Sequence, residues 1–145
     1  MTDDAAPARP QPIPDHASLP YLEASFDGKL LVQKCLHCGT FLRPVKPRCS
    51  LCFSDDLAWL EATGRATVYS FTVVHQRLHP GLADEVPYNL ALIDLEEGLR
   101  MTSRIVGVEN GQLRIGMPLE VDFETWGPET RLPVFRPSNS TEFGG

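Results

Sequence analysis

The sequence has no apolar run long enough to cross a membrane and no secretory signal at its start. A membrane-spanning helix needs about 18–20 apolar residues, and no stretch of the chain approaches that length. The opening segment, MTDDAAPARP, supplies neither the basic nor the apolar part of a signal peptide. We therefore expect a cytoplasmic protein without a membrane partner. In that reducing compartment, paired cysteines are expected to bind a metal or act in redox chemistry, not to form disulfides.

The sequence also lacks the residue patterns of a self-sufficient enzyme. It contains no Ser/His/Asp set, no Gly-rich phosphate loop and no HExxH motif. Asp94, Glu96 and Glu97 fit the tip of a hairpin better than a catalytic carboxylate cluster. We expect a chain that does not catalyse a reaction alone.

Positive charge is scarce except in one segment of a chain whose net charge is −6. Residues 29–53 contain five Lys or Arg and no acidic residue, whereas residues 54–137 contain seven Arg and thirteen acidic residues. Nucleic-acid binding depends on neutralising phosphates with many cations. A module for single-stranded nucleic acid is therefore the least favoured of the functions considered.

All four cysteines lie in the basic segment, in two CxxC pairs. Cys35 and Cys38 form the first pair, Cys49 and Cys52 form the second, and ten residues separate the pairs. Zinc takes four thiolates in a tetrahedron, and each CxxC turn presents two sulfurs to one ion. Gly39 follows the first pair, where the turn favours a positive φ. Four cysteines leave no position for water, so we predict a structural Zn²⁺ site; rubredoxin-type iron fits the same sulfurs.

The cations around the cysteines have two interpretations. Four thiolates on one divalent ion carry a net negative charge, which nearby Lys and Arg side chains would partly neutralise. Alternatively, these side chains bind the phosphates of a ligand. The sequence does not decide between the two.

Both ends of the chain are predicted to be flexible. Residues 1–20 contain five prolines and few large apolar side chains, and residues 138–145 have the composition of a frayed tail. Within residues 21–34, apolar side chains recur at helical spacing until Gly28, which predicts a short helix and an extended lead-in. The helix either folds back on the domain or docks on a partner.

The rest of the sequence indicates β-structure, with a zinc ribbon assigned to residues 35–53 and an OB-fold to residues 54–137. Segment 57–63 is assigned to the beginning of the first barrel strand. Apolar alternation and turn signals predict five strands, at residues 64–75, 88–95, 98–107, 119–126 and 131–137. We therefore predict a mainly β protein with a five-stranded barrel. The long connection at residues 76–87 is expected to take part in binding.

In this order, the segments resemble the acyl-CoA-associated zinc-ribbon/OB-fold family, long catalogued as a domain of unknown function. The resemblance covers about residues 21–137. It is carried by GKLLVQKCLHCG, PRCSLCFSDDLAWLEATGRATVYSFTVVH, HPGLADEVPYNLALIDLEEGLRMTSRIVG, IGMPLEVDF and LPVFRP. One departure is Leu36, because a proline is common after the first cysteine of the family.

The resemblance implies an N-terminal helix, a rubredoxin-like zinc ribbon and an OB-fold barrel. It also implies a non-catalytic accessory subunit in a hetero-oligomer with a thiolase-like protein dimer that acts on acyl-CoA esters. The reaction would be retro-aldol cleavage, as in steroid side-chain degradation, or acyl transfer. Some family members instead accompany hot-dog-fold enoyl-CoA hydratases. In each case the partner carries the catalytic residues, and this chain stabilises the partner and helps to form its substrate and CoA site.

A CoA thioester shared with the partner would need cations on this chain. The candidates lie in the ribbon and at the long connection, and they are Arg43, Lys46, Arg48, Arg77 and His79. Arg77 and His79 are also explained as the polar start of a loop. The main alternative function is a standalone acyl-CoA-binding protein, which predicts that the isolated chain binds CoA.

Overall fold

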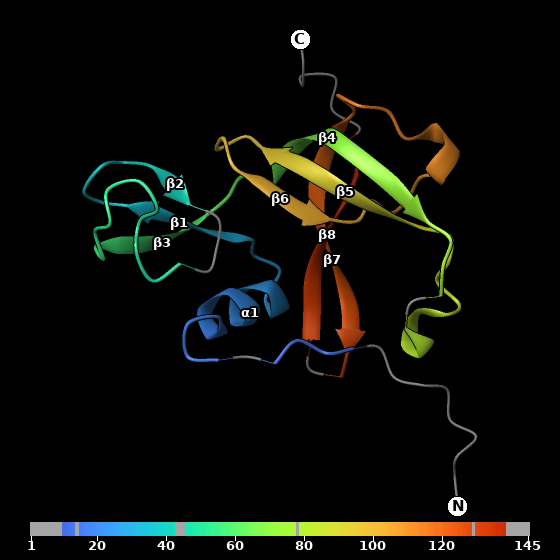
Figure 1. Cartoon of the computed structure of the whole chain (residues 1–145), viewed down its shortest axis with the longest axis horizontal. Helices are drawn as coiled ribbons and strands as arrows, with labels where there is room; N and C mark the ends of the chain where they lie inside the picture. The colour runs from blue at the N-terminus through green and yellow to red at the C-terminus, as the bar shows by residue number, and fades with distance from the viewer. Residues whose placement is uncertain (1–9, 14, 43–45, 78, 129, 139–145) are drawn as a thin grey trace, which may run out of the picture.

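The computed structural model describes residues 10–13, 15–42, 46–77, 79–128 and 130–138. These residues form one α-helix, a three-stranded sheet and a five-stranded sheet, whose strands pair antiparallel. Figure 1 shows the smaller sheet at one end of the long axis of the molecule and the larger sheet beside it. Within the described part of the chain, no helix has the length and apolar character needed to span a membrane.

The smaller sheet belongs to the cysteine segment. Its strands are β1 (Leu31–Cys35), β2 (Phe41–Leu42) and β3 (Leu57–Glu61), in the order β2-β1-β3. The position of β3 differs from the prediction that segment 57–63 begins the first barrel strand. Instead, β3 pairs with β1 from Leu31↔Glu61 to Cys35↔Leu57. The sheet therefore extends on both sides of the predicted ribbon, residues 35–53.

The larger sheet confirms the prediction of five barrel strands. These are β4 (Arg65–Val74), β5 (Tyr88–Leu95), β6 (Arg100–Ser103), β7 (Pro118–Gly127) and β8 (Thr130–Pro137). Their order is β6-β5-β4-β7-β8.

The two edges of this sheet meet beyond the end of β6. Ile105 forms a parallel bridge with Phe135 of β8. The Phe135 amide donates to the Arg104 carbonyl at 3.0 Å, and the Val106 amide donates to the Phe135 carbonyl at 2.8 Å. These bonds curl the sheet into a barrel and satisfy backbone groups that an open edge would leave unpaired.

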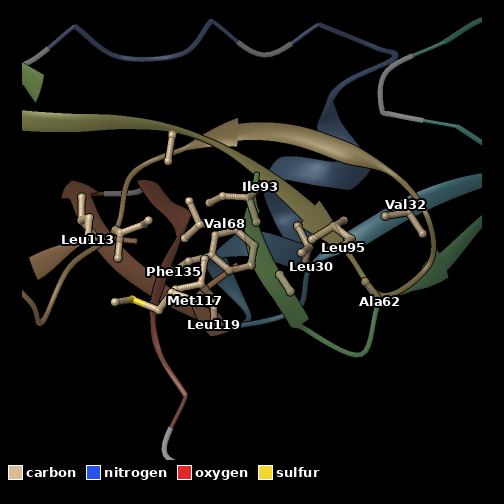
Figure 2. Packing of buried hydrophobic residues seen from close by; sticks show 13 residues of the cluster. Leu30, Val32, Ala62, Val68, Ile93, Leu95, Leu113, Met117, Leu119 and Phe135 are labelled. Atoms are coloured by element: carbon tan, nitrogen blue, oxygen red, sulfur yellow. The ribbon is translucent and has the colours of Figure 1, made fainter. Parts of the chain in front are cut away.

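One apolar core fills the barrel and continues towards the ribbon. Strand β5 buries every second side chain, as a strand with one face on a core must. Phe135, Ile93 and Leu119 are completely buried. Figure 2 shows Phe135 among Val68, Ile93 and Met117. Val32 and Ala62 lie at the end of the same core that is next to the zinc ribbon. Ribbon and barrel are therefore packed through shared side chains.

The helix α1 (Leu19–Phe26) packs on β8 and β1, so it folds back on the domain. Arg131 of β8 donates from Nη1 to the Phe26 carbonyl at 2.9 Å, which satisfies an acceptor at the helix end. Gly28, at φ 81°, follows the helix in the position predicted for it.

The described residues before the helix, which belong to the predicted flexible arm at residues 1–20, contact strand β7. The Trp126 indole Nε1 donates to the Pro10 carbonyl at 2.7 Å, and Gln11 Nε2 donates to the Trp126 carbonyl at 3.1 Å. The helix also begins at Leu19, within the range predicted as an arm. The rest of that prediction, residues 1–9 and 14, and most of the predicted tail, residues 139–145, lie outside the described residues.

Two connections contain short 3₁₀ helices, η1 (Pro80–Leu82) and η2 (Asn110–Gln112). The first lies in the long connection between β4 and β5. There, His79 Nδ1 accepts a hydrogen bond from the Gly81 amide at 2.9 Å and caps η1.

Gly64, between β3 and β4, offers a test of how tightly the ribbon joins the barrel. Its φ is +85°, and a Cβ atom there would lie 2.6 Å from Cγ1 of Val121 in β7. We expect Gly64→Ala to lower the free energy of unfolding by about 3 kcal/mol, through backbone strain and overpacking. Gly98→Ala is the matched control, because Gly98 has φ +90° and no atom within 4 Å of the added methyl group. Gly98→Ala should lower the free energy of unfolding, measured in urea, by only about 1 kcal/mol. Equal losses in the two variants would contradict the close packing of Gly64 on Val121.

Candidate functional site

The structure brings the four predicted cysteine ligands together. The Sγ atoms of Cys35 and Cys52 lie 3.6 Å apart, and those of Cys38 and Cys49 lie 3.7 Å apart. All four sulfurs are within 4.8 Å of one another. A tetrahedron of sulfurs at about 2.3 Å from a central zinc has S–S edges of about 3.8 Å. The residues therefore fit one Zn²⁺ ion, held by four thiolates in a closed shell.

The two CxxC turns have the same backbone geometry. The Cys38 amide points to Cys35 Sγ and the Cys52 amide to Cys49 Sγ, each at 3.5 Å. The residue after each pair has a positive φ, 79° for Gly39 and 64° for Phe53. The sequence predicted this conformation for Gly39 but not for Phe53, although Phe53 occupies the equivalent position. A bulky side chain is strained there, so the second CxxC turn adopts the same backbone geometry without a glycine and at a cost in strain.

Hydrogen bonds favour the thiolate form of Cys38 and Cys49 but not of Cys52. A hydrogen bond with the Ser54 backbone lowers the pKa of Cys52, but burial and the other three cysteines outweigh it and raise that pKa to about 12. The Thr40 side chain and then the Thr40 backbone lower the pKa of Cys38 to about 6. The Cys52 and Leu51 amides lower the pKa of Cys49. Because Zn²⁺ binds thiolate and not thiol, these contacts ease the loss of protons that metal binding requires.

Two of the predicted CoA-contacting residues lie in the ribbon. Both Lys46 and Arg48 are exposed. The backbone of Lys46 is fixed by the buried Gln33 side chain, whose Oε1 accepts from the Lys46 amide at 2.8 Å and whose Nε2 donates to its carbonyl at 3.1 Å. Arg48 Nη1 donates to the Phe53 carbonyl at 3.2 Å. Arg43 lies outside the described residues.

The other two predicted CoA-contacting residues lie far from the ribbon. Arg77 is exposed after β4, and His79 caps η1. Figure 1 shows the connection with η1 and the ribbon at opposite ends of the long axis. The structure therefore does not bring Arg77 and His79 together with Lys46 and Arg48.

An apolar cleft of about 340 Å³ lies on the barrel side of the molecule. Its walls come from α1, from the connection with η1, and from β5 to β8. The sequence did not predict this cleft, because its lining is drawn from six segments. The long connection was the available signal, and it supplies Leu82 and Glu85 to one wall.

One cation lies among the described lining residues of the cleft. Arg104, just after β6, donates from Nη1 to Glu85 at 3.1 Å and also pairs with Glu124 of β7. These three side chains are only 22–24% exposed. The cluster holds two carboxylates and one guanidinium, so its formal charge is negative.

Comparison with known proteins finds a matching family model for the ribbon and another for the barrel. Residues 27–58 match the rubredoxin-like zinc ribbon domain of ChsH2, and residues 59–124 match its C-terminal OB-fold domain. A DUF35 domain-containing scaffold protein of Methanocaldococcus jannaschii is 33% identical over 95 residues, which are 65% of this chain and 67% of that protein. The chain belongs to the DUF35 family.

Relatives in this family include parts of acyl-CoA enzymes. A chain of the "Ltp2-ChsH2(DUF35) aldolase" superposes with a TM-score of 0.79 at 38% identity, covering 88% of this chain and 98% of that chain. The "Probable enoyl-CoA hydratase alpha subunit" of Thermomonospora curvata is 39% identical over 130 residues, which are 90% of this chain. The chain spans only 40% of that hydratase subunit.

The metal centre gives a prediction for the second CxxC turn. Cys49→Ser should reduce bound zinc from one ion per chain to less than about one tenth at micromolar zinc, because three cysteines hold the ion less tightly. Ser50→Ala, an exposed position in the same turn, is the control and should keep the full zinc content. Elemental analysis of the purified chains measures both. Full zinc in Cys49→Ser would show that the four sulfurs are not one site.

The cleft gives a prediction for alkaline pH. Burial raises the pKa of Tyr21, on the α1 wall, to about 12 from an ordinary value of 10. The folded state thus favours the neutral phenol, so this contribution to stability is complete below pH 10 and is lost as the pH rises towards 12. The melting temperature of the wild type should fall more than that of Tyr21→Phe between pH 9 and 11. Parallel pH profiles would contradict the burial of this phenol.

Proposed function

We propose that this chain is a non-catalytic, zinc-binding accessory subunit of a thiolase-superfamily enzyme that acts on acyl-CoA esters. The observation that carries the proposal is the match to a chain of the Ltp2-ChsH2(DUF35) aldolase, of which 98% is covered at 38% identity. A thiolase-like partner is what the family resemblance implies. The subunit would work in the cytoplasm, where its cysteines remain reduced and free to bind zinc.

The chemistry of the chain supports a structural contribution. Four cysteines around one ion leave no coordination position for water or substrate, so zinc would fix the shape of the ribbon and not act as a Lewis acid. In this proposal the partner supplies the residues that break or form the carbon–carbon or thioester bond. The present chain stabilises the partner and contributes surface to its substrate site.

The nucleotide end of CoA would meet the ribbon. Lys46 and Arg48 are exposed there, in a segment of the chain without acidic residues. The connection that contains Arg77 and His79 lies at the opposite end of the molecule from the ribbon (Figure 1), so one CoA phosphate group cannot contact both pairs. We therefore assign the phosphate contacts to Lys46 and Arg48, and we assign His79 to shaping the connection by capping η1.

A second candidate is an accessory role beside a hydratase of the hot-dog fold. It is favoured by the hydratase alpha subunit of Thermomonospora curvata and by a Mycobacterium tuberculosis relative named 3-oxo-4,17-pregnadiene-20-carboxyl-CoA hydratase alpha subunit. The chain spans 40% and 29% of these two proteins, so most of each relative lies outside the match. This role would be favoured if a complex that contains this chain hydrates an enoyl-CoA and neither cleaves an acyl-CoA nor transfers its acyl group.

The proposal is tested by reconstituting the chain with a thiolase-superfamily protein from the same cells. We expect the acyl-CoA cleavage or transfer activity to fall at least tenfold without the chain, or with Cys35→Ser, because loss of the ribbon shape releases the partner. His37→Ala is the control, because His37 is exposed within the first CxxC turn. A Cys35→Ser complex with full activity would rule out a zinc-held accessory subunit.

A further inference from the structure

We propose that the apolar cleft binds the uncharged acyl end of a thioester ligand and discriminates against the free carboxylic acid. This inference rests on the proposed function for the source of the ligand, but the cleft and its charges stand without it. The nucleotide end of CoA is excluded from this site, because the lining offers no unpaired cation among the described residues.

The walls of the cleft are suited to a hydrocarbon group. Side chains of Leu90, Met101, Leu132 and Val134 line it, and Trp126 supplies an aromatic surface. A volume of about 340 Å³ lies at the lower end of the range of about 300–1,000 Å³ that small-ligand pockets occupy. A medium-length acyl chain therefore fits, and burying it removes apolar surface from water on both sides.

The charged cluster in the cleft determines which polar end of a ligand is tolerated. Arg104 is already paired with Glu85 and Glu124, so a ligand carboxylate would add a third negative charge beside one cation. Displacing Glu124 to make room would separate its carboxylate from Arg104 in a site of low exposure. An ester, thioester or amide brings no charge and avoids this cost.

The same cluster keeps the cleft formed in the absence of a ligand. Glu85 belongs to the connection between β4 and β5, and its bond to Arg104 ties that connection to the barrel. Leu82, three residues earlier, lies at the end of η1 and lines the cleft. The ion pair therefore holds an apolar wall in place, so the long connection takes part in binding through Leu82 and Glu85.

The test uses the zinc-loaded full chain and two probes of equal chain length, S-octanoyl-N-acetylcysteamine and sodium octanoate. The first is an uncharged thioester without a nucleotide, and the second is a carboxylate at pH 7.5. In a Trp59→Phe background, the remaining tryptophan is Trp126 on the cleft wall. We expect saturable quenching or enhancement of its fluorescence by the thioester. Octanoate should bind at least tenfold more weakly, a difference of about 1.4 kcal/mol.

Two variants on one strand locate the binding. Leu90 and Leu92 of β5 are 45% and 37% exposed and lie on the same face of the strand, but only Leu90 is among the described residues that line the cleft. Leu90→Glu should weaken thioester binding about tenfold, whereas Leu92→Glu should change it less than twofold. Leu90→Gln replaces Leu90→Glu if the charged variant melts at a lower temperature than Leu92→Glu.

Three results would overturn the proposal. They are no saturable thioester signal, equal affinity for octanoate, and equal weakening by the two leucine variants. None of them depends on the partner enzyme. If the chain restores the activity of its partner but does not bind the thioester, only the proposal for the cleft is refuted. If the chain binds the thioester but raises the activity of no partner enzyme, the accessory role is refuted and the cleft remains an acyl-binding site.

Discussion

The geometry of four sulfurs around one ion is the constraint on which the rest of the structure depends. The ribbon has almost no core of its own, since its buried cluster consists of Cys35, Leu42 and Cys49, with Cys52 and Leu57 packed against it. A bound metal would supply the cohesion that so few apolar side chains cannot. Cys35 ends β1, and β1 fixes β3, which leads through Gly64 into the barrel. The metal would thus hold the strands whose apolar side chains pack the ribbon on the OB-fold.

Two proposed binding surfaces lie on different parts of the molecule. The exposed Lys46 and Arg48 lie on the ribbon, and the apolar cleft with its negative charge cluster lies on the barrel. A thioester of CoA has the same division, with anionic phosphates at one end and an uncharged acyl group at the other. In our account the two ends of such ligands are recognised by different parts of this chain.

The sequence predicted features that depend on neighbouring residues better than features that depend on distant ones. Strand β5 was predicted at its observed limits, because alternating burial from Tyr88 to Leu95 is a local pattern. The assignment of β3 differs because its residues do not reveal which sheet they join. Likewise, the hydrogen bond from Trp126 to Pro10 joins residues 116 positions apart. Arg104, Glu85 and Glu124 each resemble a surface charge in the sequence, and only the fold brings them into one cleft.

The most direct test of the central claim is native mass spectrometry of the chain isolated from its own cells. The account predicts a particle that contains this chain, one zinc ion per copy, and a protein of the thiolase superfamily. It also predicts that a strong chelator removes the zinc and separates the two proteins. A zinc-loaded monomer without a partner would contradict the accessory role, and a complex that survives removal of the metal would contradict the role of the metal in assembly.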